Sequence, residues 1–166
     1  MPMARDSRLL LSRLLAVVLV TVGAASCSSV SRGPGGQVTK VKQTHLIPNE
    51  RVRAQDPALT FERQYLLYGA VTAAQQMERA GQYWAAQWKA DDRSQPVTVR
   101  FDYRQAQTGL KVHTLEEVVD PVKRSNWSKF QVTGAAYSGD GLVTAWKLTL
   151  LQNGQEIASQ QSYLWE

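Results

Sequence analysis

The sequence predicts an all-β domain, an antiparallel two-sheet sandwich, and three observations support this fold class. Apolar and polar residues alternate strictly from Val97 to Arg104, a period of two that is typical of a half-buried strand. Several other short segments are rich in β-branched and aromatic residues, which favour strands. Turn signals, above all Asn153-Gly154, separate these segments. By architecture alone, the expected topology is immunoglobulin-like or fibronectin-like.

The expected strands follow one another at short intervals along the chain. In order, they are Val38–Leu46, Gln64–Thr72, Gln82–Lys89, Val97–Arg104, Leu110–Val119, Phe130–Tyr137, Leu142–Leu151 and Gln155–Trp165. The alternation is weak in the first of them and clearer in the fifth, which Pro121 ends because proline cannot donate a hydrogen bond to a sheet.

The segment from Asp56 to Ala90 gives conflicting signals. Asp56 before Pro57 resembles a helix N-cap followed by proline at the first helical position, and the alanines after residue 69 also suit a helix. Tyrosine, valine and threonine within 64–72, and the aromatic residues within 82–89, favour strands instead. We therefore expect two strands here, joined by a long turn through Gly81.

Two hairpins are expected in the C-terminal part of the chain. Ser138-Gly139-Asp140-Gly141 contains residues that tolerate positive φ, so a tight turn should join the strands on either side of it. Asn153-Gly154 is the strongest short hairpin signal. One face of the strand between the two turns carries an apolar row, namely Leu142, Trp146, Leu148 and Leu150.

The N-terminal segment has the order of a signal peptide. Arg5, Arg8 and Arg13 come first, an apolar run from Leu14 to Val22 follows, and small residues then lead to Cys27. A transmembrane anchor is disfavoured because a spanning helix needs about 20 predominantly apolar residues, more than this run supplies.

The stretch Gly23-Ala24-Ala25-Ser26-Cys27 resembles the lipobox of bacterial lipoproteins, although Ala24 stands where leucine is commonest. The resemblance implies cleavage before Cys27 and acylation of this residue, which is the only cysteine. Two or more acyl chains would hold the protein stably on membrane lipid. Ser28, where an aspartate would redirect sorting, implies the outer membrane, with the domain outside the cytoplasm.

These features divide the chain into three parts. Residues 1–26 form the expected signal peptide, and residues 27–37 the acylated N-terminus and a linker rich in Gly, Pro and Ser that should remain flexible. Residues 38–166 form a single β-sandwich domain, a length that suits one hydrophobic core.

Charge argues against a nucleic-acid partner. The full chain has a net charge of +5, and loss of Arg5, Arg8, Arg13 and Asp6 with the signal peptide lowers it to +3. The basic residues form no dense stripe of the kind that binds nucleic acid.

Motifs that carry chemistry are absent from the sequence. His45 and His113 lie far apart with no cysteine near either, and neither a Gly-x-Ser-x-Gly nor a phosphate-binding Gly-rich motif occurs. The acidic pairs Asp91-Asp92 and Glu116-Glu117 are adjacent, which would point them to opposite faces of a strand. We expect no catalytic residue, no metal site and no cofactor.

Tryptophan gives the only positive indication of a binding surface, because aromatic side chains dominate both cores and binding hot spots. We expect Trp146 in the core and Trp127 and Trp165 partly exposed; Trp84, Trp88 and Trp127 are the candidate contact residues. The favoured function is an envelope module that binds a protein partner. A carbohydrate or peptidoglycan binding module remains as the alternative, and an enzyme is the least supported.

Overall fold

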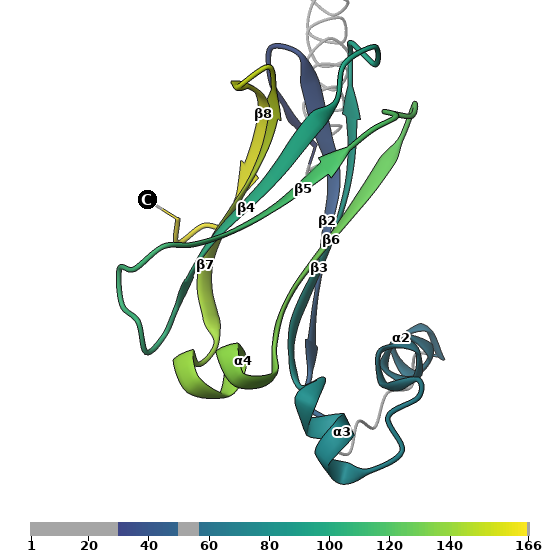
Figure 1. Ribbon diagram of the computed structural model, residues 1–166, viewed down its shortest axis with the longest axis vertical. Coiled ribbons are helices and arrows are strands. Elements are labelled where there is room, and N and C mark those ends of the chain that lie inside the picture. The colour runs from purple at the N-terminus through teal and green to yellow at the C-terminus, as the bar shows by residue number, and fades with distance from the viewer. Residues whose placement is uncertain (1–29, 50–56, 166) are drawn as a thin grey trace, which may run out of the picture.

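The computed structural model describes residues 30–49 and 57–165, and it confirms the predicted sandwich. Two antiparallel four-stranded sheets pack face to face (Figure 1). The first sheet contains, in spatial order, β1 (Ser31–Arg32), β2 (Gly36–Leu46), β3 (Gly81–Ala90) and β6 (Asn126–Thr133). The second contains β5 (His113–Val119), β4 (Val97–Gln105), β7 (Val143–Gln152) and β8 (Gln155–Gln161). The helices are α2 (Pro57–Leu67), α3 (Ala73–Glu78) and α4 (Gly134–Asp140).

The order of the strands differs from that of a constant-type immunoglobulin domain. Apart from the short β1, seven strands form a three-stranded and a four-stranded sheet, joined by connections that cross between them. In the constant-type immunoglobulin arrangement the fourth of seven strands belongs to the first sheet. Here the corresponding strand, β5, pairs with β4 in the second sheet.

Aromatic residues from both sheets meet in the core. Phe101 of β4 lies with its ring centroid 4.9 Å from that of Trp84 and 5.2 Å from that of Phe130 across the sandwich. Trp88, Leu148 and other inward-facing residues complete a buried cluster around these rings. Each such side chain contributes about 1.5–3 kcal/mol when it leaves water, so this cluster is the main source of stability.

Most strand predictions are confirmed. The strictly alternating segment is β4, and Leu148 and Leu150 of β7 are fully buried while Trp146 packs against the core. Asn153 and Gly154 have φ angles of 52° and 77° in the β7–β8 turn, the left-handed pair that a tight hairpin requires. The predicted inner row is wrong at Leu142, which is exposed because β7 begins at Val143 and a bulge beside Thr144 changes the alternation.

The predicted hairpin through residues 138–141 is wrong. β6 ends at Thr133, and Gly134–Asp140 forms helix α4. β6 and β7 belong to different sheets, which lie about 10 Å apart in a sandwich. A two-residue turn cannot cover this distance, whereas the short helix does.

The strand predicted over 64–72 is also wrong. Helix α2 contains the first part of this segment, up to Leu67, and Gly69, with a φ of +82°, lies just beyond its end. Thr72 then caps α3, accepting from the Gln75 amide while the Gln75 side chain accepts from the Thr72 amide, a capping box. Local helix signals therefore prevail over the strand preference of the tyrosines. The strand predicted over 82–89 is confirmed as part of β3.

The flexible linker predicted over 27–37 needs correction in its described part. Ser31–Arg32 and the start of β2 already belong to the first sheet, and Gly35 N donates to the carbonyl of Ile157 in β8 at 3.1 Å. A Cβ at Gly33 would clash with that same carbonyl oxygen. The glycines here permit close approach to β8 rather than flexibility. In the described part of the chain, no helix is long and apolar enough to span a membrane.

Candidate binding groove

Helix α2 lies against the outer face of the first sheet without burying a residue of its own. Glu62 joins the helix to β2: its Oε2 atom lies 2.7 Å from Lys42 Nζ, and its Oε1 atom accepts from Thr44 Oγ1 at 2.9 Å. Arg63 donates to the carbonyl of Ile47 at 3.0 Å and also to that of Pro48. Polar contacts therefore hold α2 in place.

The C-terminal end of α2 is held by Arg79, which follows α3. The Arg79 guanidinium donates to the carbonyls of Leu66 and Tyr68 at 3.0 and 2.6 Å. The last carbonyls of a helix have no partner within it and carry partial negative charge, so an arginine there satisfies both hydrogen bonding and charge.

A groove runs between the helix and the sheet. One hollow of about 290 Å³ lies beneath α2 and continues into another of about 550 Å³ toward α3; Tyr65, Leu66, Tyr83 and Gln131 line both. Lys42, Glu62, Lys129 and Phe130 are among the other residues of the first hollow. We refer to these joined hollows as the α2 groove.

Tyr83 and Lys129 are two sheet residues of the groove that could meet a ligand with a polar group. The Tyr83 hydroxyl donates to the Arg79 carbonyl at 2.6 Å, and burial raises its pKa while the Arg79 charge opposes the rise. The Lys129 ammonium lies 5.7 Å from the centroid of the Tyr65 ring, within reach of a cation–π contact. In the described ranges Lys129 forms no ion pair, so its charge is available to a ligand.

The outer surface of α2 is apolar and exposed. Leu59, Phe61, Tyr65 and Tyr68 all face solvent, and Tyr68 is 82% exposed. Ile47, Val71 and Met77, on the adjoining segments, are exposed as well. Exposed apolar side chains gathered on one helix and the segments next to it are typical of an interaction site.

Two of the three candidate tryptophans have buried side chains, although Trp84 is among the residues that line the groove. Trp84 and Trp88 are buried in the core, where the Trp88 indole N–H donates to Ser128 Oγ at 3.0 Å. Their positions on β3 alternate with those of Tyr83 and Ala85, which face the groove. Trp127 alone is 48% exposed, beside a separate hollow of about 460 Å³ between β5 and β6. Cys27 lies outside the described residues.

Trp127 nevertheless lies on the same sheet face as the groove. Trp127, Lys129 and Gln131 are spaced two residues apart along β6, and residues two apart on a strand point to the same face. The aromatic residue is therefore two positions from the free lysine of the groove.

In residues 30–49 and 57–165, the two histidines lie in separate places, and each contacts a tyrosine. His45 hydrogen-bonds the Tyr137 hydroxyl at 2.7 Å, and His113 stacks on Tyr103 with ring centroids 5.2 Å apart. This part of the chain contains no group of three His, Cys, Asp or Glu side chains that could hold a metal ion. The groove offers groups suited to binding: aromatic and apolar side chains, polar side chains, and the cation of Lys129.

Sequence reasoning missed Tyr65, Leu66 and Tyr68 of the groove because it assigned residues 64–72 to a strand. Phe61, Tyr65 and Tyr68 are spaced by four and three residues, the repeat of one helix face. That spacing, together with Pro57 at the first position, was the sequence signal that indicates helix α2. Comparisons of the chain with family models, curated proteins and solved structures find no match.

Proposed function

We propose that this protein is a bacterial envelope lipoprotein, anchored through acylated Cys27, whose sandwich binds a protein partner in the α2 groove without catalysing a reaction. The observation that carries the proposal is a helix with no buried residue, held by polar contacts over a sheet and exposing Phe61, Tyr65 and Tyr68. Exposing these side chains to water is unfavourable, and a partner that covers them would gain their hydrophobic free energy.

The anchor is supported by the sequence alone. The basic start, the apolar run and the small residues before Cys27 have the order of a lipoprotein signal, and Ser28 favours the outer membrane. The domain is then displayed outside the cytoplasm, tethered to membrane lipid.

The groove also limits the chemistry of the partner. Lys42 is already paired with Glu62, whereas Lys129 has no acidic partner in the described ranges. We therefore expect a segment that inserts apolar side chains beneath α2 and places a carboxylate near Lys129. The charge would add specificity and association rate more than affinity.

A photo-crosslinking residue placed at Tyr65 tests the site in intact cells. We expect one dominant envelope protein to crosslink there and none at Val118, an equally exposed residue on the edge of the second sheet. Binding of that purified partner should be lost in Phe61→Asp and Lys129→Glu and retained in Val118→Asp. Equal binding by all three variants would refute the groove as the site.

The anchor is tested separately by labelling cells with a fatty-acid analogue and fractionating membranes from wild type and Cys27→Ser. We expect the wild type alone to incorporate label and to remain with the membrane. A membrane-bound, unlabelled wild type would mean that the apolar segment anchors the protein without acylation.

A carbohydrate or peptidoglycan ligand is the second candidate, and Trp127 is the observation that favours it. The half-exposed indole borders a hollow that also contains Glu117, Lys123 and Asn126, and sugar rings pack on such aromatic faces. Soluble peptidoglycan fragments should then shift the tryptophan fluorescence of wild type but not of Trp127→Phe. The burial of Trp84 and Trp88 leaves this candidate a smaller aromatic surface than the sequence suggested.

A further inference from the structure

Just after β8, an ordered turn presents two apolar side chains to solvent. Residues Ser162 to Trp165 form the turn, with a hydrogen bond from Trp165 N to Ser162 O at 3.1 Å. Tyr163 and Leu164, at its tip, are 93% and 64% exposed. We refer to Ser162–Trp165 as the C-terminal turn.

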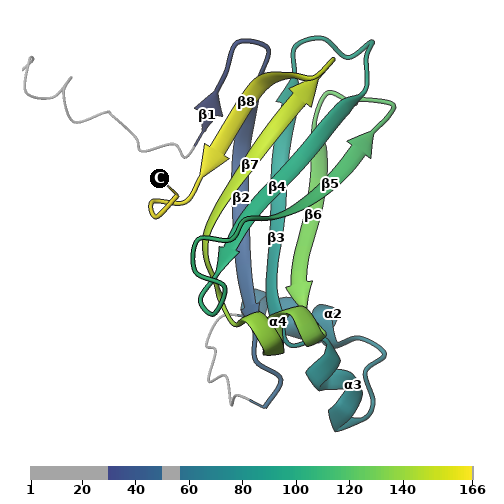
Figure 2. The ribbon, with the colours of Figure 1, turned by 60° about the vertical axis from the view of Figure 1, so that its left-hand side comes forward.

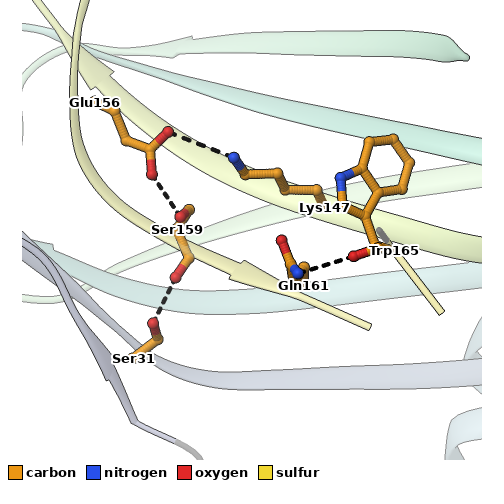
Figure 3. Close-up of polar contacts among 6 residues, drawn as sticks. All are labelled: Ser31, Lys147, Glu156, Ser159, Gln161 and Trp165. Atoms are coloured by element: carbon orange, nitrogen blue, oxygen red, sulfur yellow. Dashed lines mark hydrogen bonds and ion pairs between the residues drawn. The ribbon is translucent and has the colours of Figure 1, made fainter. Parts of the chain in front are cut away.

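Contacts with the second sheet fix the C-terminal turn in place. Trp146 N donates to Ser162 Oγ at 2.9 Å. Figure 3 shows a second contact, in which Gln161 Nε2 donates to the Trp165 carbonyl at 2.9 Å. The Arg104 guanidinium lies 4.6 Å from the centroid of the Trp165 ring. These contacts hold the backbone of the turn against the second sheet, so the exposed side chains of Tyr163 and Leu164 project from a fixed position.

The N-terminal end of the described chain runs toward the same place. Gly35 N donates to Ile157 O at 3.1 Å, and Ser31 Oγ donates to Ser159 O at 2.5 Å. The residue number falls along β1 as it rises along β8, so the two segments are antiparallel. Val30 therefore lies at the end of β1 that is directed toward the end of β8, Gln161, and the C-terminal turn after it. Figure 2 shows the start of β1 close to the C-terminus.

Chain length then limits the distance between this region and the lipid anchor. Three peptide units join Cys27 to Val30, and an extended chain covers at most about 3.6 Å per residue, so the two Cα atoms are within about 11 Å. With Cys27 acylated, Val30 must lie close to the headgroups. Val30 and Arg32 are both exposed, and Arg32 forms no ion pair in residues 30–49 and 57–165.

We infer that the C-terminal turn, together with Val30 and Arg32, is a membrane-contact surface that rests in the headgroup layer of the bilayer holding Cys27. This inference depends on the proposed lipid anchor. Tyrosine and tryptophan are enriched at that depth of a bilayer, and the exposed cation of Arg32 on β1 suits anionic headgroups. The acyl chains would hold the protein on the membrane, and the turn would set its orientation.

This orientation has a consequence for the α2 groove. The C-terminus lies on the side of the second sheet, whereas α2 lies on the opposite side of the sandwich, over the first sheet (Figure 1). A domain that rests on its C-terminal turn therefore directs the groove away from the lipid, toward partners in the aqueous compartment.

A fluorescent label that responds to solvent polarity tests the surface. Acylation occupies the thiol of Cys27, so a new cysteine in Leu164→Cys can be labelled selectively in the full lipidated protein. The protein is reconstituted in vesicles of phosphatidylethanolamine and phosphatidylglycerol. Val71→Cys is the matched control, because Val71 is also apolar, is 86% exposed and lies beside α3.

We expect the label at position 164 to shift to the blue in vesicles and to lose emission when the lipids carry bromine near the headgroups, and the label at position 71 to change in neither way. Adding Arg32→Glu to Leu164→Cys should reduce both changes at position 164. If the protein floats with the vesicles and position 164 behaves like position 71, the surface is refuted and the anchor stands. If it carries no fatty-acid label and does not float, both are refuted.

Discussion

Helix α2 should open independently of the sandwich, because polar contacts rather than burial hold it. Its 11 residues are too few for a stable isolated helix, since helices below about 12–15 residues are marginal in water. Glu62 makes two of the contacts that join α2 to β2, one with Lys42 and one with Thr44. The informative perturbation is therefore Glu62→Ala, which removes both and leaves Arg63 and Arg79 in place.

The expected magnitude follows from the exposure of these groups. The side chains of Lys42 and Glu62 are 49% and 23% exposed, so solvent screening limits the ion pair to about 0.5 kcal/mol. A hydrogen bond from Thr44 contributes about 0.5–1.5 kcal/mol net. The total loss of about 1–2 kcal/mol corresponds to a 5- to 30-fold larger population of the open state.

Amide hydrogen exchange measures this local opening directly. In Glu62→Ala, the amides of residues 61–67 should exchange about 5- to 30-fold faster, while those of β4 and β7 keep their protection. Glu116→Ala is the matched control, because it breaks the surface ion pair with Arg100 on the second sheet and should leave α2 unchanged. Equal acceleration across the whole domain would refute the idea that α2 opens on its own.

Three further predictions concern the sandwich. Ser128→Ala leaves the buried Trp88 indole N–H without its acceptor and should cost about 1–3 kcal/mol; a thermal melt should show Tm several degrees lower, against no change in the exposed Ser138→Ala. Gly154→Ala places a side chain at a φ of +77° and should lower the free energy of unfolding in urea by about 1 kcal/mol, so an unchanged denaturation midpoint would contradict the turn geometry. Burial raises the pKa of both Tyr83 and Tyr103 above their ordinary value of 10.0; the folded state therefore binds these protons more tightly, and the stability they contribute is complete below pH 10 and is lost as pH rises through the folded-state pKa values. Unfolding measured on both sides of pH 10 should show this decline, and it should be shallower when both tyrosines are changed to Phe.

The fold was predictable where one face of a strand is buried and the other is wet. Under that condition the sequence must alternate, as it does from Val97 to Arg104 in β4. The β7–β8 turn was equally readable, because only a few residue types tolerate the left-handed φ of Asn153 and Gly154. The same reasoning failed at residues 138–141, since the turn residues are present but the strands on either side belong to different sheets.

The candidate site was less predictable than the fold. Tyr65 and Tyr68 have a high intrinsic preference for strands, yet they lie in or beside a helix, because local capping and spacing outweigh propensity. Trp84 and Trp88 are large aromatic residues whichever way they face, so composition could not distinguish a core position from a binding surface. Burial depends on which strand face meets the other sheet, and that is a property of the whole fold.

The sequence by itself determined the β-sandwich class, the position of the strictly alternating strand β4 and the expectation of a lipid anchor at Cys27, because these follow from local periodicity, turn chemistry and the order of residues near the N-terminus. Only the tertiary structure decided that α2 lies over the first sheet and forms a groove with Lys129, and that the segment of β1 lies against β8. Both arrangements join segments far apart in the chain, through contacts such as Glu62 with Lys42 and Ser31 with Ser159. A local pattern carries no information about such pairs, since their proximity depends on how the two sheets pack.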